Sequence, residues 1–381
     1  MIPYIFFTLF AALTAVYMLF LFRMRAGLRF LAARSREETD GVAASLPSVT
    51  VLLPVRDEEA VLPHCLASLS AQEYPAAQLE VLVVDDHSSD RSADIVRTRA
   101  EEDSRFQLLS CGEEEEGKKA ALTRGVSAAR GEIIVTTDAD CRHDTQWLRT
   151  LLQPFADGAD VVAGPVVIDT RARLFARLQA MEFLGLVGVG AGFFGIGYPR
   201  MCNAANFAYR RSCFEAAGGY EANRGIHSGD DEFLLHDIVY RQEGKAEFVT
   251  APGALVRTGA QQTMRAFLRQ RVRWASKGSR YEDRRFVSFL VLLFVYFLFA
   301  AAAPVVSVTS TAAALAGIVF LLLKILADAR VLFAAAALFR QPLRIGEFLA
   351  AEFLHAYYIV VVSILGQFGV FSWKNRSMRN V

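Results

Sequence analysis

Two aspartates one residue apart, Asp138 and Asp140 in the segment VTTDADCRHD, have a spacing that suits a divalent cation. Side chains alternate along an extended chain, so residues i and i+2 point the same way and both carboxylates can face one site. Carboxylates that close repel each other unless positive charge lies near them. Mg²⁺ and Mn²⁺ bind through one or two carboxylates plus substrate phosphates. The pair therefore predicts a Mg²⁺ or Mn²⁺ site, with two aspartates in a solvated turn as the alternative.

A second acidic segment, SGDDEFLL at 228–235, offers carboxylates for proton transfer. A general base must be ionised and must lie near the hydroxyl that it deprotonates. An aspartate at its usual pKa is a weak base, and a neighbouring carboxylate such as Asp230 or Glu232 would raise the proton affinity of Asp231. The alternative interpretation is an acidic helix start, where negative charge meets the positive end of the helix dipole.

Short apolar runs alternate with helical patterns between about residues 45 and 250, and these elements must position the carboxylates. Runs typical of buried strands are 48–55, 79–86, 105–110 and 132–140. Helical patterns lie between them at 58–72, 92–103 and 118–130. The alternation predicts an α/β fold with a mostly parallel sheet and helices on both faces. Ligands of such sheets bind beyond the carboxyl ends of the strands, which is where Asp86, Asp138 and Asp140 fall.

The chain is 53% hydrophobic, which is too apolar for an ordinary soluble protein of 381 residues and predicts membrane segments. Residues 2–22 form an uncharged apolar run, and a membrane span needs about 20 such residues. Arginines follow this run and no Lys or Arg precedes it, so residue 23 onward is expected in the cytoplasm. We therefore expect an N-terminal transmembrane anchor at 1–22 and a basic cytosolic linker at 23–44.

The apolar C-terminal region, 286–371, is expected to hold about three transmembrane segments and to end in a basic tail, 372–381. The stretch 328–344 contains an apolar run too short to cross and is expected at the cytoplasmic surface. Three spans would leave the tail outside, whereas its basic residues favour the inside. Two alternatives stay open: one segment is re-entrant, or the spans override the charges of the tail. The ionisable residues of this region are expected near span ends, which disfavours a transporter: Lys324, Asp328, Glu347, Glu352 and His355.

Net charge gives no support for a nucleic-acid-binding protein, and cysteine usage gives none for a disulfide framework. The net charge is only +1, so bulk charge does not indicate a nucleic-acid partner. The five cysteines are odd in number and none shows C-x-x-C spacing. A reduced, cytosolic setting fits these cysteines better than a disulfide framework.

A set of motifs occurs in order across residues 54–274: PVRDEEAVL, VVDDHSSD, GKKAALTRG, TTDAD, NAANFAYRR, SGDDEFLL and QRVRW. In this order they resemble a membrane-anchored family 2 glycosyltransferase of the GT-A fold, related to processive polysaccharide synthases and lipid-directed glycosyltransferases. The resemblance covers about residues 45–285, and an ordered set is far more specific than one motif. It implies a GT-A catalytic domain at 45–260 and an interfacial amphipathic helix with the Q-x-x-R-W pattern at 261–285.

The resemblance also implies roles for single residues. Asp138 and Asp140 would hold the metal on the donor's diphosphate, Asp231 would be the catalytic base, and Asp230 would be the acidic residue before it. The donor nucleotide would be bound by Pro54, Arg56, Glu58, Asp86, Lys118 and Asp138. The family usually has Asn-Glu where this chain has Asp57-Glu58, so Asp57 loses a hydrogen-bond donor.

Further roles fall on the later motifs. Gln270 and Arg273 would reach the donor's phosphates, and Trp274 would help to form the acceptor site. The alternative for this helix is a basic surface that binds anionic lipid heads. The motif NAANFAYRR resembles the floor of the donor and acceptor site. Cys141 is expected to pack internally, and His143 is expected to be a surface histidine rather than a third metal ligand.

The glycine-rich apolar segment 174–200 has two open interpretations, a lining for an apolar acceptor or a buried packing segment. The function implied by the resemblance is inverting transfer of a sugar from a nucleotide-diphosphate sugar, uridine-based, to a lipid or growing glycan. The partners would be that donor, that acceptor and membrane lipids, at the cytoplasmic face of the inner membrane. Two alternatives stay open: a processive polysaccharide synthase, and a catalytically inactive membrane scaffold.

Overall fold

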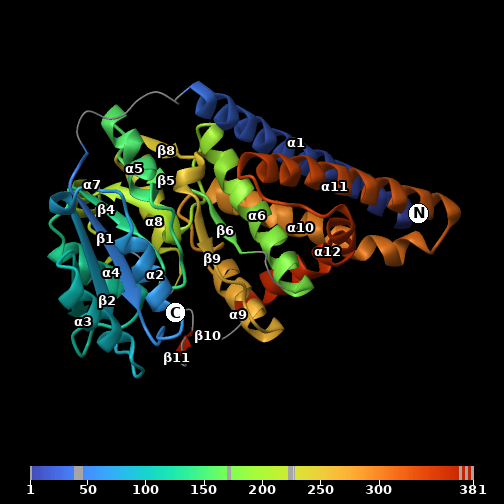
Figure 1. The fold of residues 1–381 in the computed structure, drawn as a ribbon. Helices are drawn as coiled ribbons and strands as arrows, with labels where there is room; N and C mark the ends of the chain where they lie inside the picture. The colour runs from blue at the N-terminus through green and yellow to red at the C-terminus, as the bar shows by residue number, and fades with distance from the viewer. Residues whose placement is uncertain are drawn as a thin grey trace.

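The computed structural model describes residues 2–37, 46–169, 173–221, 226, 228–368, 371–373 and 376–378. An α/β domain forms one end of the molecule and a group of long helices forms the other (Figure 1). The predicted fold class, a mostly parallel α/β sheet accompanied by long apolar helices, is confirmed.

The α/β domain is built on a 7-stranded sheet with the order β3-β2-β1-β4-β7-β5-β8. Strands β3, β2, β1 and β4 are parallel, whereas β7 runs antiparallel to both β4 and β5. Their bounds are Val49–Val55 (β1), Leu79–Asp85 (β2), Phe106–Ser110 (β3), Ile133–Thr136 (β4), Val161–Ala163 (β5), Phe207–Arg210 (β7) and Ala246–Phe248 (β8). A separate pair, β6 (Val166–Ile168) and β9 (Val256–Thr258), lies beside the sheet.

The central strands are continuous apolar runs because helices cover both of their faces. Leu52 of β1 and Leu82 of β2 pack into the same apolar cluster as helix α4, while Val51 and Leu53 pack with α2 on the other face. The covering helices are α2 (Leu62–Ser70), α3 (Ser92–Glu102), α4 (Lys118–Ala128), α5 (Trp147–Leu152), α7 (Arg211–Ala216) and α8 (Asp230–His236).

The described residues include five helices that are long and apolar enough to cross a membrane. They are α1 (Ile2–Glu37), α6 (Leu174–Gly195), α10 (Arg284–Ser307), α11 (Thr311–Leu338) and α12 (Ile345–Phe368). A shorter helix, α9 (Met264–Ala275), carries the QRVRW motif, and two short strands follow α12, β10 (Phe371–Trp373) and β11 (Arg376–Met378).

Three segment boundaries differ from the sequence-based expectation. Helix α1 continues to Glu37, so most of the expected linker 23–44 is helical, and 38–44 lies outside the described residues. The stretch 328–338, expected as a separate surface segment, is the second half of α11 and is not interrupted. Its charges do not break the helix because Asp328 is bonded to Tyr17 and Lys324. Only Met264–Ala275 of the expected interfacial helix 261–285 is α-helical.

Glu347 lies near the start of α12, as expected, but Lys324, Asp328, Glu352 and His355 lie inside α11 and α12 and not at their ends. Lys324 lies at the middle of α11, and only 3% of it is exposed. Its ammonium group contacts the carboxylates of Asp328, at 2.7 Å, and Glu352. The sequence shows the charges but not the partner helix, so it cannot distinguish a snorkelling lysine from one paired inside the protein.

Helix α1 is fixed to α6 by a crossing of glycines. A Cβ on Gly27 would lie 2.1 Å from the carbonyl oxygen of Gly192, and Gly195 meets the backbone of Gly27. Small residues allow this close approach of two apolar helices. Arg34, near the end of α1, bonds Glu247 of β8 at 2.5 Å. These contacts attach the long helices to the α/β domain.

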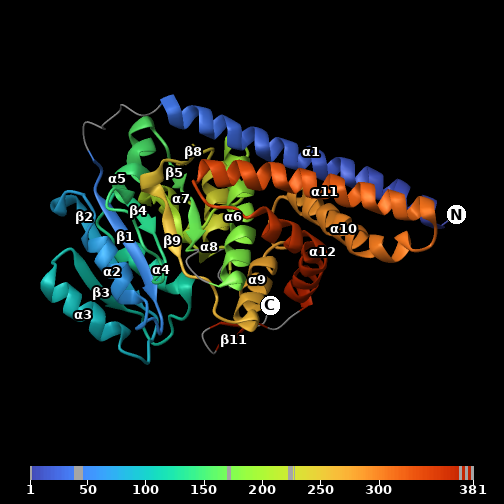
Figure 2. The same ribbon diagram turned by 45° about the vertical axis from the view of Figure 1, so that its right-hand side comes forward.

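Helix α12 runs across the direction shared by α1, α10 and α11 (Figure 1, Figure 2). Near its start, Glu347 pairs with Arg177 of α6 at 2.7 Å. Near its end, the Gln367 amide donates to the carbonyl oxygen of Ala275, the last residue of α9. Both ends of α12 therefore contact helices that lie next to the α/β domain.

Candidate active site

The loops after β1 and β2 are joined by the residues that the sequence assigns to the nucleotide. Arg56 Nη1 donates to the carbonyl oxygen of Asp86 at 3.1 Å and lies 3.6 Å from its carboxylate. Asp86 Oδ2 accepts from the backbone N–H of Gly117, just before α4. The backbone N–H of Glu58 donates to Ser92 Oγ, and Pro54 lies in β1 itself. Pro54, Arg56, Glu58 and Asp86 are thus gathered at the carboxyl edge of the sheet.

Asp57, where the family usually has Asn, has a role within the chain. It adopts a left-handed backbone conformation, with φ of 50°. Its carboxylate accepts from the backbone N–H and the hydroxyl of Ser89, at 2.7 and 3.0 Å. These hydrogen bonds lower the pKa of Asp57. Asp57 therefore uses a side-chain oxygen, a hydrogen-bond acceptor that Asn would also have, to connect the loops after β1 and β2.

Lys118, the first residue of α4, connects two acidic motifs. Its Nζ lies 2.7 Å from Asp138 Oδ1 and 3.6 Å from Asp230 Oδ2. Burial lowers the pKa of Lys118, but the charges of Asp138 and Asp230 outweigh burial and raise it overall. The lysine stays charged and brings the carboxylate after β4 close to the carboxylate that begins α8.

Asp138 and Asp140 follow β4 and provide oxygen atoms for a hard cation. The Asp138 side chain is 40% exposed, and Asp140 Oδ2 accepts from the hydroxyl of Thr258 at 2.9 Å. Burial raises the pKa of Asp140, and the charge of Asp138 adds to the increase. A cation between them would relieve this repulsion, so an all-oxygen pair fits Mg²⁺ or Mn²⁺.

Neither neighbour of this pair is a ready metal ligand. Cys141 is buried, as expected, and burial raises the pKa of its thiol. His143 is half-buried rather than on the surface, and its two ring nitrogens bond Ser68 at 3.0 Å and Thr137 at 2.8 Å. Burial lowers the pKa of His143 to about 3, so it is a neutral structural residue.

Asp231 has the environment of a general base. Its Oδ2 accepts from the backbone N–H of Ala204, and its Oδ1 accepts from that of Glu232, both at 2.8 Å. Burial raises the pKa of Asp231 to about 6; Lys277 acts against this shift, while Asp230 and Glu232 add to it. A carboxylate tuned toward neutral pH is a better base than an ordinary aspartate.

Asp230 shows the opposite behaviour. Burial alone would raise its pKa, but Lys118 and Lys119 outweigh burial and lower it. Its Oδ2 is buried and accepts no hydrogen bond from the described residues. Adjacent carboxylates with pKa values shifted apart indicate different roles, with Asp230 ionised and Asp231 able to exchange a proton.

Helix α9 presents the three residues of the QRVRW motif to the same space. Gln270, Arg273 and Trp274 all line the cavity that also contains Asp138 and Asp230. Burial lowers the pKa of Arg273, and both carboxylates oppose this shift, so the guanidinium lies close to them. The Trp274 ring lies 5.7 Å from that of Phe183 in α6.

Arg271 and Glu182 support this helix, and the sequence interpretation missed their pairing. Arg271 is 3% exposed, and its Nε donates to both carboxylate oxygens of Glu182 at 3.0 Å. The Arg271 guanidinium lies 4.2 Å above the Trp274 ring and donates to Gln270 Oε1 at 2.6 Å. Tyr358 of α12 also donates to Glu182. Glu182 is the only carboxylate in the apolar α6, which was the signal available in the sequence.

The motif NAANFAYRR contributes less to the site than the sequence resemblance implied. Asn203 lines the cavity and caps a short 3-10 turn. Asn206 is fully buried and bonds Trp147 and two backbone carbonyl groups. Arg210 pairs with Glu132 at 2.6 Å. Asn206 and Arg210 therefore hold the domain together instead of lining the site.

A cavity of about 1220 Å³ joins the charged site to the long helices. Its charged end contains Lys118, Asp138, Asp140, Asp230 and Asp231. Its other walls are mostly apolar and come from α1, α6, α9, α10, α11 and α12, with Phe193, Phe289, Leu293 and Ile359 among them. The glycine-rich segment has two different faces in α6: Val187 and Gly190 line this cavity, while Gly192 packs on α1.

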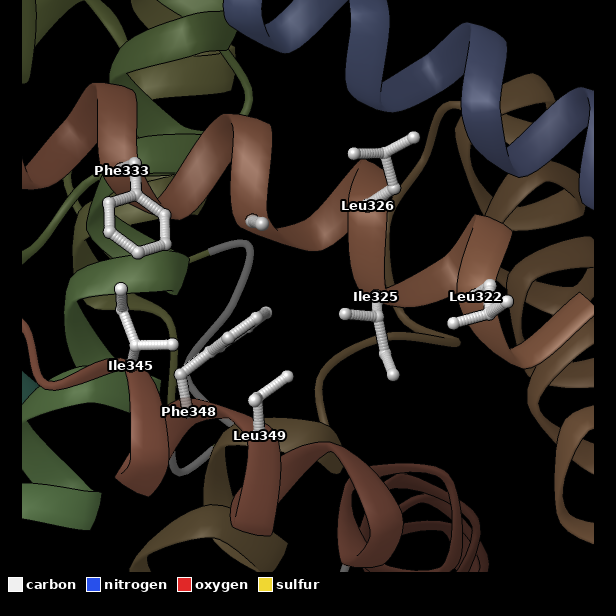
Figure 3. Close-up of a pocket in the computed structure, with 8 residues that line it drawn as sticks. Leu322, Ile325, Leu326, Phe333, Ile345, Phe348 and Leu349 are labelled. Carbon is white, nitrogen blue, oxygen red and sulfur yellow. The ribbon is translucent and has the colours of Figure 1, made fainter. Parts of the chain in front are cut away.

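A smaller hollow of about 440 Å³ lies between α11 and α12 (Figure 3). The side chains that line it are all apolar, with Leu322, Phe333 and Phe348 among them. It offers no group that could take part in acid–base chemistry or hold a metal.

Comparison with known proteins agrees with this geometry. Residues 50–217 match the model of the family described as Glycosyl transferase family 2. The chain is 29% identical over 259 residues to a probable glycosyltransferase, YdaM, of Bacillus subtilis, covering 64% of this chain and 58% of YdaM. It is 34% identical over 115 residues to an undecaprenyl-phosphate 4-deoxy-4-formamido-L-arabinose transferase of Pseudomonas aeruginosa, covering 30% of this chain and 34% of that enzyme. The matched part is thus little more than half of YdaM and about a third of the second relative.

One solved structure is similar over nearly the whole chain. The mannosyltransferase PcManGT from Pyrobaculum calidifontis, solved in complex with GDP-Man and Mn²⁺, superimposes with a TM-score of 0.54 at 21% identity. The match covers 97% of this chain and 100% of that one. At this level of identity the likeness establishes the fold. Residues 50–217 therefore match a glycosyl transferase family 2 domain, the fold is that of a GT-A glycosyltransferase, and long apolar helices accompany it.

Proposed function

We propose that the protein moves a sugar from a uridine-based nucleotide-diphosphate sugar to a lipid acceptor, with inversion at the anomeric carbon. The observation that carries this proposal is the single cavity that joins the carboxylates Asp138, Asp140 and Asp231 to an apolar space between long helices. An acceptor with an apolar body and a hydroxyl group fits both ends of such a cavity. A hydrophilic glycan would leave its polar groups unpaired against the apolar walls.

The donor occupies the carboxyl edge of the sheet in this proposal. Its nucleoside lies against the loops that hold Arg56 and Asp86, and its diphosphate lies near Lys118 and Arg273. Arginine suits phosphate through its planar fork of donors, and the start of α4 adds backbone N–H groups. Asp138 and Asp140 hold Mg²⁺ or Mn²⁺, which when bound would offset the negative charge on the departing nucleoside diphosphate.

Asp231 is the base in this mechanism. Its ionised carboxylate accepts the proton of the acceptor hydroxyl while that oxygen bonds the anomeric carbon. The bond from this carbon to the diphosphate breaks on the opposite side, which inverts the configuration. Lys118 and Arg273 stabilise the charge that develops on the diphosphate. Trp274, held by Arg271, offers a flat face to the sugar or to the acceptor.

The helix arrangement supports a specific placement in the inner membrane. Helices α1, α10 and α11 cross it, with the N-terminus outside and the catalytic domain at the cytoplasmic face. Helix α12 contacts α6 near its start and α9 near its end. These three helices therefore form a layer between the crossing helices and the domain. The tail after α12 then lies on the cytoplasmic side, which agrees with its basic residues.

The experiment that tests the proposal offers nucleotide sugars to the purified protein with native lipids and measures release of nucleoside diphosphate. We expect release that depends on Mg²⁺ or Mn²⁺ and falls at least 100-fold in Asp140→Asn and Asp231→Asn, as for loss of a metal ligand or a general base. Asp94→Asn, an equal change in an exposed ion pair of α3, is the control and should keep full activity. Nucleotide binding without release from any donor would contradict the proposal and favour the scaffold alternative.

A further inference from the structure

A cluster of ionisable side chains lies at the end of the cavity that is formed by the long helices. It contains Tyr17 of α1, Lys324 and Asp328 of α11, and Glu352 and His355 of α12. Tyr17, Asp328, Glu352 and His355 line the same cavity as the carboxylates of the active site. Ionisable groups inside a membrane helix bundle are costly, and they usually mark a binding site or pathway.

Lys324 already fills the position that a metal ion would need. The carboxylates of Asp328 and Glu352 and a ring nitrogen of His355 lie close enough together to hold a metal ion. However, the Lys324 ammonium group donates to Asp328 at 2.7 Å, to Glu352, and to His355 Nδ1 at 3.3 Å. An ammonium group has three donors, and these contacts use all three. The cluster is therefore a satisfied ion-pair network with its own cation.

The contact with Lys324 determines which ring nitrogen of His355 carries a proton. An ammonium group can only donate, so His355 Nδ1 must accept and the neutral ring must carry its proton on Nε2. The His355 side chain is 30% exposed and lines the cavity. No hydrogen bond of Nε2 is found among the described residues. His355 therefore offers one N–H donor to a ligand in the cavity.

Two buried hydroxyl groups near the cluster also lack partners among the described residues. Tyr296 is 1% exposed, its hydroxyl makes no hydrogen bond, and its ring stacks on that of Tyr17 at 4.2 Å. Thr14, one turn before Tyr17 on α1, is 2% exposed and its hydroxyl is also unpaired. Buried polar groups are rarely left without a partner. Neither Tyr296 nor Thr14 lines the cavity, however, so these hydroxyls belong to the interior beside the cluster and do not contact a ligand in the cavity.

We propose that this cluster, on the part of the cavity wall formed by α1, α11 and α12, binds a second hydroxyl group of the lipid acceptor, apart from the hydroxyl that reaches Asp231. This inference rests on the proposed function. A hydroxyl can both donate and accept, so it can accept from His355 Nε2–H and donate to the carboxylate of Asp328 or Glu352. The apolar walls between the two ends fit an apolar body. The acceptor class is therefore a long apolar molecule with a hydroxyl at each end.

Binding of simple probes tests this inference without sugar transfer. The purified protein would be incubated with a series of linear α,ω-alkanediols and with 1-alkanols of equal length, and the bound molecules would be counted by native mass spectrometry. We expect the wild type to retain the diol of matching length about tenfold more than the alcohol, as one added hydrogen-bonding group allows. Equal retention of diol and alcohol at every length would overturn the inference.

Variants of His355 separate recognition from packing. His355→Phe keeps a flat ring beside Phe297, which lies 5.4 Å away, and should bring the diol-to-alcohol ratio close to one. His355→Gln retains an N–H donor and should keep a clear preference for the diol. Ile359→Leu, one turn along α12 in the same cavity wall, should leave the ratio unchanged. Equal loss of diol and alcohol in His355→Phe would show a packing role only and would overturn the inference.

The same experiment distinguishes this inference from the proposed function. Sugar transfer to a lipid without any diol preference would overturn the inference and leave the proposed function intact. Diol preference without transfer from any donor would contradict the proposed function, while the hydroxyl site itself would stand. Zn²⁺ binding that requires His355, together with no diol preference, would make the cluster a metal site and would also overturn the inference.

Discussion

At the scale of single residues, Asp230 and Asp231 show how neighbours in sequence acquire different chemistry. Lys118 and Lys119 lower the pKa of Asp230, whereas burial raises that of Asp231. Only the charged form of Asp231 can accept a proton. We therefore expect kcat/KM to be constant above the pKa of about 6 and to fall as the pH decreases through it, tenfold per unit at the limit.

The measurement for this prediction is a pH profile of nucleoside diphosphate release between pH 5 and 8. Asp231→Glu, which keeps a carboxylate, should retain a measurable acid limb with reduced rate. A profile that is flat down to pH 5 would contradict the role of Asp231 as the base.

The sequence predicted the positions of Asp138 and Asp140 in the fold better than it predicted their contacts. The spacing of Asp138 and Asp140, placed after a strand, was enough to locate them at the carboxyl edge of the sheet. The contact of Asp138 with Lys118 depends on how the start of α4 lies next to the loop after β4, which no local pattern encodes. The pairing of Glu182 with Arg271 was missed for the same reason, because the two residues lie on helices that meet only in the fold.

At the scale of elements, the contact between α6 and α9 determines the position of Trp274. Glu182→Gln would leave the buried Arg271 without a charged partner, and the helix would shift or loosen. We expect kcat/KM for lipid glycosylation to fall about tenfold or more, since hydrogen bonds to charged groups contribute about 1.5–3 kcal/mol. The KM for the donor should change much less, because the proposed nucleotide site lies at the loops after β1 and β2.

Steady-state kinetics with the donor and the acceptor varied in turn would check this prediction. Glu347→Gln is the matched control. It removes the ion pair between Glu347 of α12 and Arg177 at the start of α6, which is more accessible than the pair of Glu182 and Arg271. Equal losses in the two variants would contradict a specific positioning role for Glu182.

The crossing of α1 and α6 makes a second prediction at this scale. Gly27→Ala places a Cβ 2.1 Å from the carbonyl oxygen of Gly192, so the two helices must separate. We expect a loss of stability of about 1–3 kcal/mol, as for other overpacked sites. Thermal unfolding in detergent should show a clear decrease in Tm, and Gly346→Ala, which meets nothing within 4 Å, should not.

Strands were easier to predict than the ends of the long helices. The runs that became β1 and β2 are apolar on both faces, which is typical of strands covered on both sides. Charged residues suggested a break after Ala327, but Asp328 is bonded inside the bundle and α11 continues. Hydropathy along the chain cannot detect this network, because Tyr17 of α1 and Glu352 of α12 complete it.

At the scale of the whole molecule, the proposed membrane topology rests on the two contacts at the ends of α12. If α12 does not cross, the residues after it lie on the same side as the catalytic domain. We expect a cysteine introduced at Ser377, in a cysteine-free background, to react with an impermeant maleimide only when the cytoplasmic face is accessible. Cysteines at Ser127 in α4 and at Thr309 between α10 and α11 report the two sides. Labelling of the Ser377 position together with that of Thr309 would contradict this topology.

The central claim is that one cavity joins sugar transfer to a lipid acceptor, and the partition of labelled product tests it most directly. The protein with native lipids would be given its donor carrying a radiolabelled sugar, and the products would be separated into organic and aqueous phases. We predict a single labelled lipid in the organic phase that is absent in Asp231→Asn and present in Asp94→Asn. A ladder of labelled, water-soluble polymer, or label transferred equally by Asp231→Asn, would contradict the account.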